Sequence, residues 1–195
     1  KRRWAAFYAS VTFMDEQVGR ILDELDRLGL REKSAIVFTC DHGYHLGEHT
    51  FWQKSNLHEE VTRVPLVISL PGLKPGRSKS LVELVDLFPT LSAAAGLQAP
   101  GGLHGTSLLP ILKDPVARVK ESALSIHSSG TSMRTASWTY TRYKDGSEEL
   151  YDMENDPGQF TNRARDAEAA VTLAGQRKAF EKRLKAAGIK AARLR

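Results

Sequence analysis

The sequence predicts an α/β fold: part of a mixed, mainly parallel sheet flanked by helices, followed by a small antiparallel sheet with a C-terminal helix. Three observations predict it. Apolar residues recur at steps of three and four along residues 11–28, which indicates an amphipathic helix. A short turn and an apolar run follow at 36–40, and a helix that leads into a buried strand is half of a βαβ unit. Aromatic and β-branched residues then dominate 124–151, as is typical of antiparallel strands.

These patterns divide the chain into two predicted domains. Residues 1–120 are expected to belong to a large α/β domain, and residues 121–195 to form a small α+β subdomain. A chain of 195 residues is long enough to bury a core of its own.

The first helix and strand have clear boundaries. Gly29 follows the helical pattern and is expected to end the helix in a left-handed conformation. The run at 36–38, closed by Thr39 and Cys40, predicts a strand buried on both faces. Cys40 is expected to lie buried in it as a small apolar residue.

The next segment contains three more predicted elements. Residues 64–70 predict another core strand, and residues 81–85 predict a short strand. Residues 87–95 predict a helix, with Asp86 as its N-cap and Gly96 as its stop.

The second predicted domain reads as a sheet followed by a helix. Strands are expected at 124–127, 133–137, 138–143 and 150–151, with Asp145-Gly146 as a turn before the last of them. A final helix is expected at 164–187.

Charge and composition exclude several classes of protein. The net charge is +5, but residues 176–195 hold eight Lys or Arg against one Glu, so the remainder carries −2. Such a basic terminal helix is more often a solvated face than a nucleic-acid arm, and we expect no nucleic-acid partner. No apolar stretch approaches the roughly 20 residues that span a bilayer, so no membrane partner is expected. The opening residues carry no signal-peptide pattern, and we expect the chain to be part of a longer protein.

Histidines and carboxylates gather immediately after the predicted strand at 36–40. Four of the six histidines lie between His42 and His58. One interpretation is a metal and anion site, with Asp41 and His42 as adjacent ligands and with Lys54 and His45 or His49 supplying positive charge to an oxyanion. The other is a polar loop with surface histidines, which composition alone favours. Two ligands do not complete a metal site, so further ligands would come from distant sequence.

Other candidate groups are weaker. Ser10 and Ser55 do not lie in a G-x-S-x-G pattern, which disfavours a serine hydrolase. His104 and His127 stand alone and are expected to be structural. The single cysteine, Cys40, excludes an internal disulfide.

Several longer stretches resemble one family. They are YASVTFMDEQVGR at 8–20, CDHGYHLGEHTFWQKSNLHEEVTRVPLVI at 40–68, DLFPTLSAAAG at 86–96 and ELYDMENDPGQFTNRA at 149–164. In this order they resemble the C-terminal half of the sulfatase family, within the alkaline-phosphatase-like superfamily. The Asp41-His42 pair and residues 134–152 are most similar to the iduronate sulfatase and choline sulfatase branch. The resemblance implies that residues 1–120 are the C-terminal part of the large α/β sulfatase domain.

The resemblance also implies a site. Asp41 and His42, with two aspartates from an N-terminal half, would hold a divalent metal, usually calcium, although the imidazole leaves the identity of the metal open. Lys54 matches the lysine that contacts the sulfate. The implied reaction is attack by a hydrated formylglycine on the sulfur of a sulfate ester. Formylglycine arises from a C/S-x-P-S/A-R motif, which does not occur here, and Cys40 is followed by Asp41-His42 instead.

The absence of the formylglycine motif determines which partners and which alternative functions are expected. The substrate would be a sulfate-ester small molecule or glycan, and the N-terminal half of the same enzyme would supply the nucleophile, so these 195 residues alone are expected to be inactive. Family members of this kind are periplasmic, secreted or lysosomal. The alternatives are a phosphonate or phosphate ester hydrolase of the same superfamily and a non-catalytic remnant or subunit.

Overall fold

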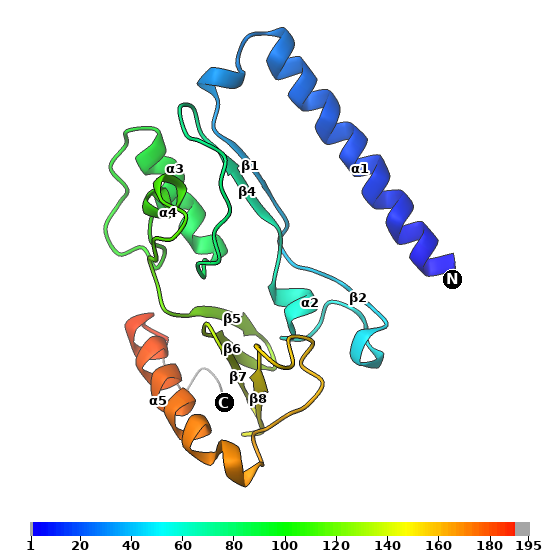
Figure 1. Cartoon of the computed structure of the whole chain (residues 1–195), viewed down its shortest axis with the longest axis vertical. Helices are drawn as coiled ribbons and strands as arrows, with labels where there is room; N and C mark the ends of the chain where they lie inside the picture. Colours follow the sequence, from blue (N-terminus) through cyan, green and yellow to red (C-terminus); the bar gives the residue numbers. More distant parts are fainter. Residues whose placement is uncertain (1, 190–195) are drawn as a thin grey trace. The chain divides into compact units, whose positions relative to one another are not determined.

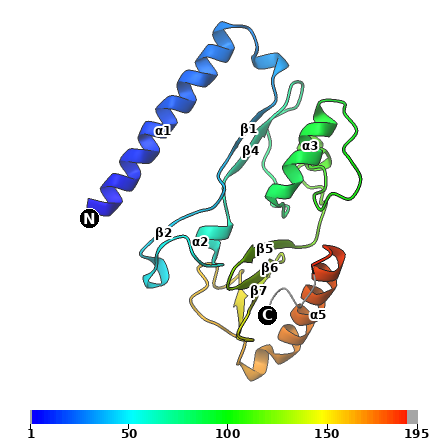
Figure 2. The ribbon, with the colours of Figure 1, turned by 180° about the vertical axis from the view of Figure 1, so that it is seen from behind.

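A computed structural model describes residues 2–189 (Figures 1 and 2). They form two compact units. The first contains the residues up to Phe38 together with Leu66–Pro75, and the second contains Thr39–Pro65 and the residues from Gly76 onward. The predicted boundary at residue 120 falls inside the second unit and stays a prediction. Within 2–189, none of the helices is both long and apolar enough to cross a lipid bilayer.

The first unit begins with the long helix α1, Arg2–Arg27. The helix starts earlier than predicted because Trp4, Phe7 and Tyr8 continue the apolar spacing of three and four. Gly29 has a φ of 66°, and the amide of Leu30 donates to the carbonyl of Leu25 at 2.9 Å, so the predicted left-handed cap is confirmed.

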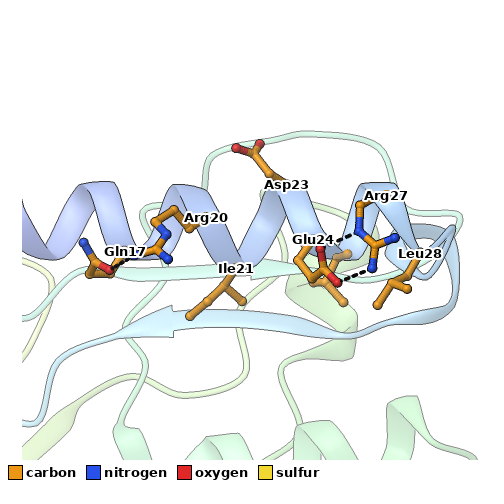
Figure 3. Close-up of a pocket in the computed structure, with 8 residues that line it drawn as sticks. Gln17, Arg20, Ile21, Asp23, Glu24, Arg27 and Leu28 are labelled. Carbon is orange, nitrogen blue, oxygen red and sulfur yellow. Dashed lines mark hydrogen bonds and ion pairs between the residues drawn. The ribbon is translucent and has the colours of Figure 1, made fainter.

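One face of α1 carries a shallow pocket that the helix itself lines (Figure 3). Glu24 and Arg27 form a bidentate ion pair there, with the Arg27 Nε–H donating to Glu24 Oε2 at 2.7 Å. Arg20 donates to Gln17 Oε1 at 2.9 Å. Because its lining comes from one exposed helix face, the pocket is a groove between side chains.

The same unit contains two paired strands, β1 (Ile36–Thr39) and β4 (Leu66–Ser69), after a 3-10 turn η1 (Arg31–Lys33). Both strands were expected, but β1 is half-buried, so the prediction of burial on both faces is wrong for the described residues. Beyond the strand ends, Thr39 Oγ1 donates to the carbonyl of Pro65 at 2.9 Å and the Gly43 amide to that of Val61 at 2.8 Å. This pairing is antiparallel, as Figure 1 also shows for β1 and β4.

The second unit starts with short elements that surround the predicted site. They are β2 (His45–Leu46), η2 (Glu48–Thr50), β3 (Trp52–Gln53) and α2 (Glu59–Thr62). The strands β2 and β3 form an antiparallel hairpin in which His45 pairs with Gln53 and Leu46 with Trp52.

The predicted strand at 81–85 is wrong: Leu84–Asp86 form a 3-10 turn, η3. Glu83 and Asp86 cap each other's backbone amides, and this local bonding outweighs the strand preference of the apolar residues. The predicted helix is confirmed as α3, Leu87–Ala94, with Gly96 at a φ of 71° beyond it. The Asp86 side chain does not cap α3; it accepts from the amides of Glu83 and Thr106. The short helix α4, Leu109–Lys113, follows.

A buried ionic network ties this turn to distant parts of the unit. Lys120 Nζ lies 2.5 Å from Glu83 Oε2 and 2.6 Å from Asp86 Oδ2, and Arg183 reaches Glu83 Oε2 at 2.8 Å. The Leu124 amide also donates to Glu83, at 2.7 Å. Because both carboxylates are almost completely buried, their cations are needed to offset the loss of hydration.

The small antiparallel sheet and its helix are confirmed, but the strand predicted at 133–137 lies at 130–134 and the helix predicted at 164–187 spans 170–186. The strands β5 (Ala123–His127), β6 (Gly130–Arg134), β7 (Trp138–Tyr143) and β8 (Glu148–Asp152) pair in sequence order. Gly146 has a φ of 85°, as the predicted turn requires. The 3-10 turn η4, Ala167–Ala169, precedes the helix α5, Ala170–Ala186. The basic stretch at 176–195 thus lies partly on α5, while residues 190–195 are outside the described part.

The core of this region lies between the sheet and α5. Its buried members are Met133, Tyr140, Leu150, Ala169, Leu173, Phe180 and Leu184. The rings of Tyr140 and Phe180 meet edge to face with centroids 5.1 Å apart, a favourable geometry for aromatic pairs. The Tyr140 hydroxyl donates to Glu148, so its burial leaves no unsatisfied polar group.

Candidate functional site

Asp41 and His42 follow β1 directly and contact each other. The His42 amide donates to Asp41 Oδ1 at 3.0 Å, and Asp41 Oδ2 lies 3.2 Å from His42 Nε2. His42 Nδ1 lies 2.9 Å from the carbonyl of Gly43, which can only accept, so Nδ1 carries a proton. In the neutral ring, Nε2 then carries a lone pair that can accept a hydrogen bond or ligate a metal.

Gly43 allows this arrangement because of close packing. A Cβ atom at this position would lie 1.9 Å from the carbonyl oxygen of Glu60, closer than any side chain permits. The Gly43 amide also bonds the carbonyl of Val61. A residue without a side chain is thus required where the chain passes from the Asp-His pair into the histidine-rich loop.

Lys54 completes a group of three side chains. Its Nζ donates to His42 Nε2, although the two residues are 12 positions apart. The structure thus brings Asp41, His42 and Lys54 together, as the sequence analysis expected for residues that share a site. An imidazole that contacts a carboxylate on one side and an ammonium on the other forms with them a group able to bind both a cation and an anion.

The charges in this group affect one another. Desolvation raises the pKa of Asp41, but the positive charge of His42, the His42 amide and the Cys40 thiol together lower it further, so the net pKa lies below the ordinary value. Asp41 is therefore ionised at neutral pH, and its side chain is 80% exposed. A charged, accessible carboxylate is what a hard divalent cation prefers.

Cys40 is exposed, which corrects the prediction that it is a buried apolar residue. Its thiol lies 2.9 Å from the carbonyl of His42. The prediction failed because β1, which leads to it, is only half-buried among the described residues.

His45 and His49 form a separate group with His58, here called the histidine cluster. His45 is fully buried, and the side chains of His49 and His58 are each 10% exposed. The rings of His49 and His58 stack with centroids 4.3 Å apart, and His45 meets each of them edge-on. Phe160 covers the cluster by stacking on His49 at 4.8 Å.

Three carboxylates surround the cluster. His49 Nε2 lies 3.4 Å from Glu60 Oε1, His58 Nε2 lies 3.9 Å from Glu149 Oε2, and His45 Nδ1 lies 4.0 Å from Glu48 Oε2. His45 Nε2 is within hydrogen-bond distance of the side-chain amide of Asn56.

Burial keeps part of the cluster neutral. Desolvation, together with the charges of His49 and His45, lowers the pKa of His58 to about 4, against a smaller opposing effect of Glu60. Desolvation likewise raises the pKa of Glu149, although hydrogen bonds from Tyr143 and Tyr151 and the charge of His49 oppose the shift. Both shifts favour uncharged forms in an apolar setting.

Among residues 2–189, no three His, Cys, Asp or Glu side chains are placed to hold a metal ion together. Asp41 and His42 nevertheless fit as two ligands of a divalent cation, because a carboxylate oxygen and the imidazole Nε2 lie 3.2 Å apart. The prediction of a divalent metal therefore rests on two ligands from this chain.

The sequence did not indicate the distant residues that bond the segment around Glu59 at the end of the histidine-rich loop. Gln159 accepts the Glu59 amide at 2.7 Å, and Arg134 Nε donates to Glu59 Oε1 at 3.1 Å. The density of histidines indicated His58 as part of the group, but nothing in the local pattern indicated Phe160 or Glu149. Those contacts join residues about a hundred positions apart, as the Glu59–Gln159 bond does.

Comparisons with known proteins identify the family that the chain resembles. A family model described as Sulfatase matches residues 2–97. Choline-sulfatase from Rhizobium meliloti (strain 1021) is 32% identical over 182 residues, covering 89% of this chain and 35% of that protein. The chain thus spans 35% of the length of this curated relative.

Solved structures share the fold. A protein solved in complex with its substrate D-glucosamine-2-N,6-O-disulfate matches with a TM-score of 0.84 and 28% identity, over 89% of this chain and 38% of that chain. The phosphonate monoester hydrolase of Agrobacterium radiobacter matches with a TM-score of 0.77 and 26% identity, over 87% of this chain and 38% of that chain.

Proposed function

Because the chain belongs to the sulfatase family, we propose that the protein hydrolyses sulfate esters, with Lys54 contacting the sulfate and Asp41 and His42 binding a divalent metal beside it. The observation that carries this proposal is the contact among these three side chains, which come from two separate positions of the chain. The substrate is a small-molecule sulfate ester or a sulfated glycan. The first is what the name of the choline-sulfatase relative implies, and the second is suggested by the sulfated sugar bound to a structural neighbour.

The chemistry that these residues can perform is electrostatic. Charge builds up on the sulfuryl oxygens during attack at sulfur, and the Lys54 ammonium stabilises that charge by direct contact. A bound metal, which we propose to be calcium, would supply further positive charge at the same oxygens. The proton on His42 Nδ1, held by the Gly43 carbonyl, keeps Nε2 directed toward the metal position.

The nucleophile in this proposal lies outside these 195 residues, because the chain contains no C/S-x-P-S/A-R motif. We propose a formylglycine supplied by an N-terminal half of the enzyme. The 195 residues alone should then hydrolyse an aryl sulfate no faster than their Asp41→Ala variant. Turnover above that control would contradict the proposal that the nucleophile comes from elsewhere.

The experiment that tests the function uses the purified enzyme that contains this chain and p-nitrophenyl sulfate. Lys54→Ala should lower kcat/KM by on the order of 10²- to 10³-fold, as the loss of one transition-state contact does. The matched control is Lys79→Ala, which changes another exposed lysine of the same unit and should leave kcat/KM unchanged. Equal activity of the Lys54 and Lys79 variants would contradict the role of Lys54.

One rival function has specific support. The phosphonate monoester hydrolase neighbour is 26% identical, and a phosphonate monoester presents a similar tetrahedral anion to a lysine and a metal. Comparing kcat/KM for p-nitrophenyl sulfate and p-nitrophenyl phenylphosphonate decides between the two. A higher value for the phosphonate would favour the rival.

A further inference from the structure

The hairpin of β2 and β3 holds an unfavourable backbone conformation. His49, Thr50 and Gln53 have φ values of 52°, 63° and 80°, in the left-handed region that residues with a side chain rarely adopt. Each such residue costs on the order of 1–3 kcal/mol unless its surroundings enforce it. Gln53 immediately precedes Lys54, so its conformation sets the direction in which Lys54 leaves the hairpin.

Bonds within the hairpin close the loop but do not attach it to the rest of the unit. The amide of Thr50 donates to the carbonyl of Gly47 at 3.2 Å, and that of Phe51 to the carbonyl of Glu48 at 2.8 Å. The Glu48 carboxylate accepts the Leu46 amide at 2.6 Å. All three bonds would move with the hairpin if it shifted as a body.

His49 attaches the η2 turn of the hairpin to residues outside it. Its ring is held between two aromatic rings from other segments, His58 at 4.3 Å and Phe160 at 4.8 Å, with interplanar angles of 17° and 27°. Its Nε2 also faces Glu60 at 3.4 Å. A residue with strained backbone thus carries a side chain that residues outside the hairpin hold on both ring faces.

We infer that His49 is a positioning residue for Lys54: its ring, stacked between His58 and Phe160, fixes the strained hairpin and so directs Lys54 toward His42. This inference deepens the proposed function, on which the importance of Lys54 rests. His49 acts through the hairpin and does not touch the substrate. His45, which is buried and pairs with Gln53, supports the other strand of the same hairpin.

The test compares two substitutions at one position. His49→Ala removes the stacked ring, whereas His49→Phe keeps an aromatic ring between His58 and Phe160. The control is His127→Ala, which changes a half-buried histidine of the small sheet. In each protein, NMR measures the nuclear Overhauser effect between the His42 ring and the Lys54 side chain, and calorimetry measures the affinity for inorganic sulfate.

We expect His49→Ala to lose the Overhauser effect and to weaken sulfate binding by on the order of tenfold. His49→Phe should keep both, within about twofold, because stacking rather than the imidazole nitrogens does the positioning. Three results would overturn the inference: an unchanged Overhauser effect in His49→Ala, its loss in His49→Phe or in His127→Ala, or its absence from the unaltered protein. Failure of sulfate-ester hydrolysis would instead reject the proposed function, since the Overhauser comparison does not depend on catalysis.

Discussion

The hairpin of β2 and β3 and the four-stranded sheet of β5 to β8 use their residues in opposite ways. The sheet has long strands in register, and its buried aromatic Tyr140 has a partner for its hydroxyl. The hairpin has strands of two residues each and three left-handed backbone positions. Both regions contain buried polar atoms without a hydrogen-bond partner, on His45 and His49 in the hairpin and on Thr131 and Thr139 in the sheet, so it is the backbone that distinguishes them. The sheet is therefore expected to stabilise the fold. The hairpin is expected to lower the stability of the fold slightly, because it holds an unfavourable backbone conformation that places Lys54.

The largest expected effect is in the core beneath the sheet. Phe180→Ala empties the space of a fully buried ring that contacts Tyr140 and lies under Arg142, and it should lower the free energy of unfolding by about 3–5 kcal/mol. Urea denaturation measures it. Val171→Ala on the same helix, where the residue is 86% exposed, should cost less than about 0.5 kcal/mol. Similar losses for the two variants would contradict the assignment of the core.

A smaller change in the free energy of unfolding should follow when the pH is lowered, because of the histidine cluster. The pKa of His58 is about 4 in the folded protein and 6.5 in the reference state, so between these values the unfolded chain binds more protons. Stability from this group is complete above pH 6.5 and is lost as the pH falls toward 4. The raised pKa of Glu149 acts in the opposite direction.

His58→Phe isolates that contribution because it keeps the stack and removes the titration. Urea midpoints measured from pH 7 to pH 4.5 should fall less steeply for this variant than for the unaltered protein. Parallel curves would mean that His58 is not held neutral by burial.

The smallest expected effect concerns the metal. Lys54→Met removes a positive charge and frees the lone pair of His42 Nε2, which Lys54 otherwise occupies. Calcium affinity should therefore rise by about fivefold, corresponding to roughly 1 kcal/mol between nearby charges. Isothermal titration with calcium measures it, with Lys79→Met as the control. Equal or weaker binding by the Lys54 variant would show that Lys54 and the metal do not share His42.

The contrast between the regular sheet and the irregular hairpin also explains which elements the sequence could predict. Helix α1 could be predicted from the spacing of its apolar residues, although none of them is buried in this structure. The strands β5 to β8 could be predicted from their aromatic and β-branched residues, because the buried members of β6 to β8 pack in a core with α5. The turn at Leu84–Asp86 was mistaken for a strand because the polar bonds of Glu83 and Asp86 decide it, and their partner Lys120 lies far along the chain.

At the candidate site, too, the local sequence predicted some residues and not others. Asp41, His42 and Lys54 were predicted together because their residue types suit a cation and an anion, and the structure brings them into contact. The enclosure of His49 by Phe160 could not be predicted, since it joins two segments more than a hundred residues apart. The exposure of Cys40 was missed because the strand pattern indicates an apolar run but not how many neighbours cover it.

The ionic network around Glu83 has a consequence for the order in which the chain is made. Glu83 and Asp86 leave the ribosome 37 and 34 residues before Lys120, and Glu83 does so 100 residues before Arg183. Until those cations emerge, the turn at Leu84–Asp86 cannot be buried without leaving two carboxylates uncompensated. The turn that precedes α3 is therefore expected to pack only after Lys120, which contacts both carboxylates, has been made, and Arg183 adds a second cation to Glu83 once α5 is complete.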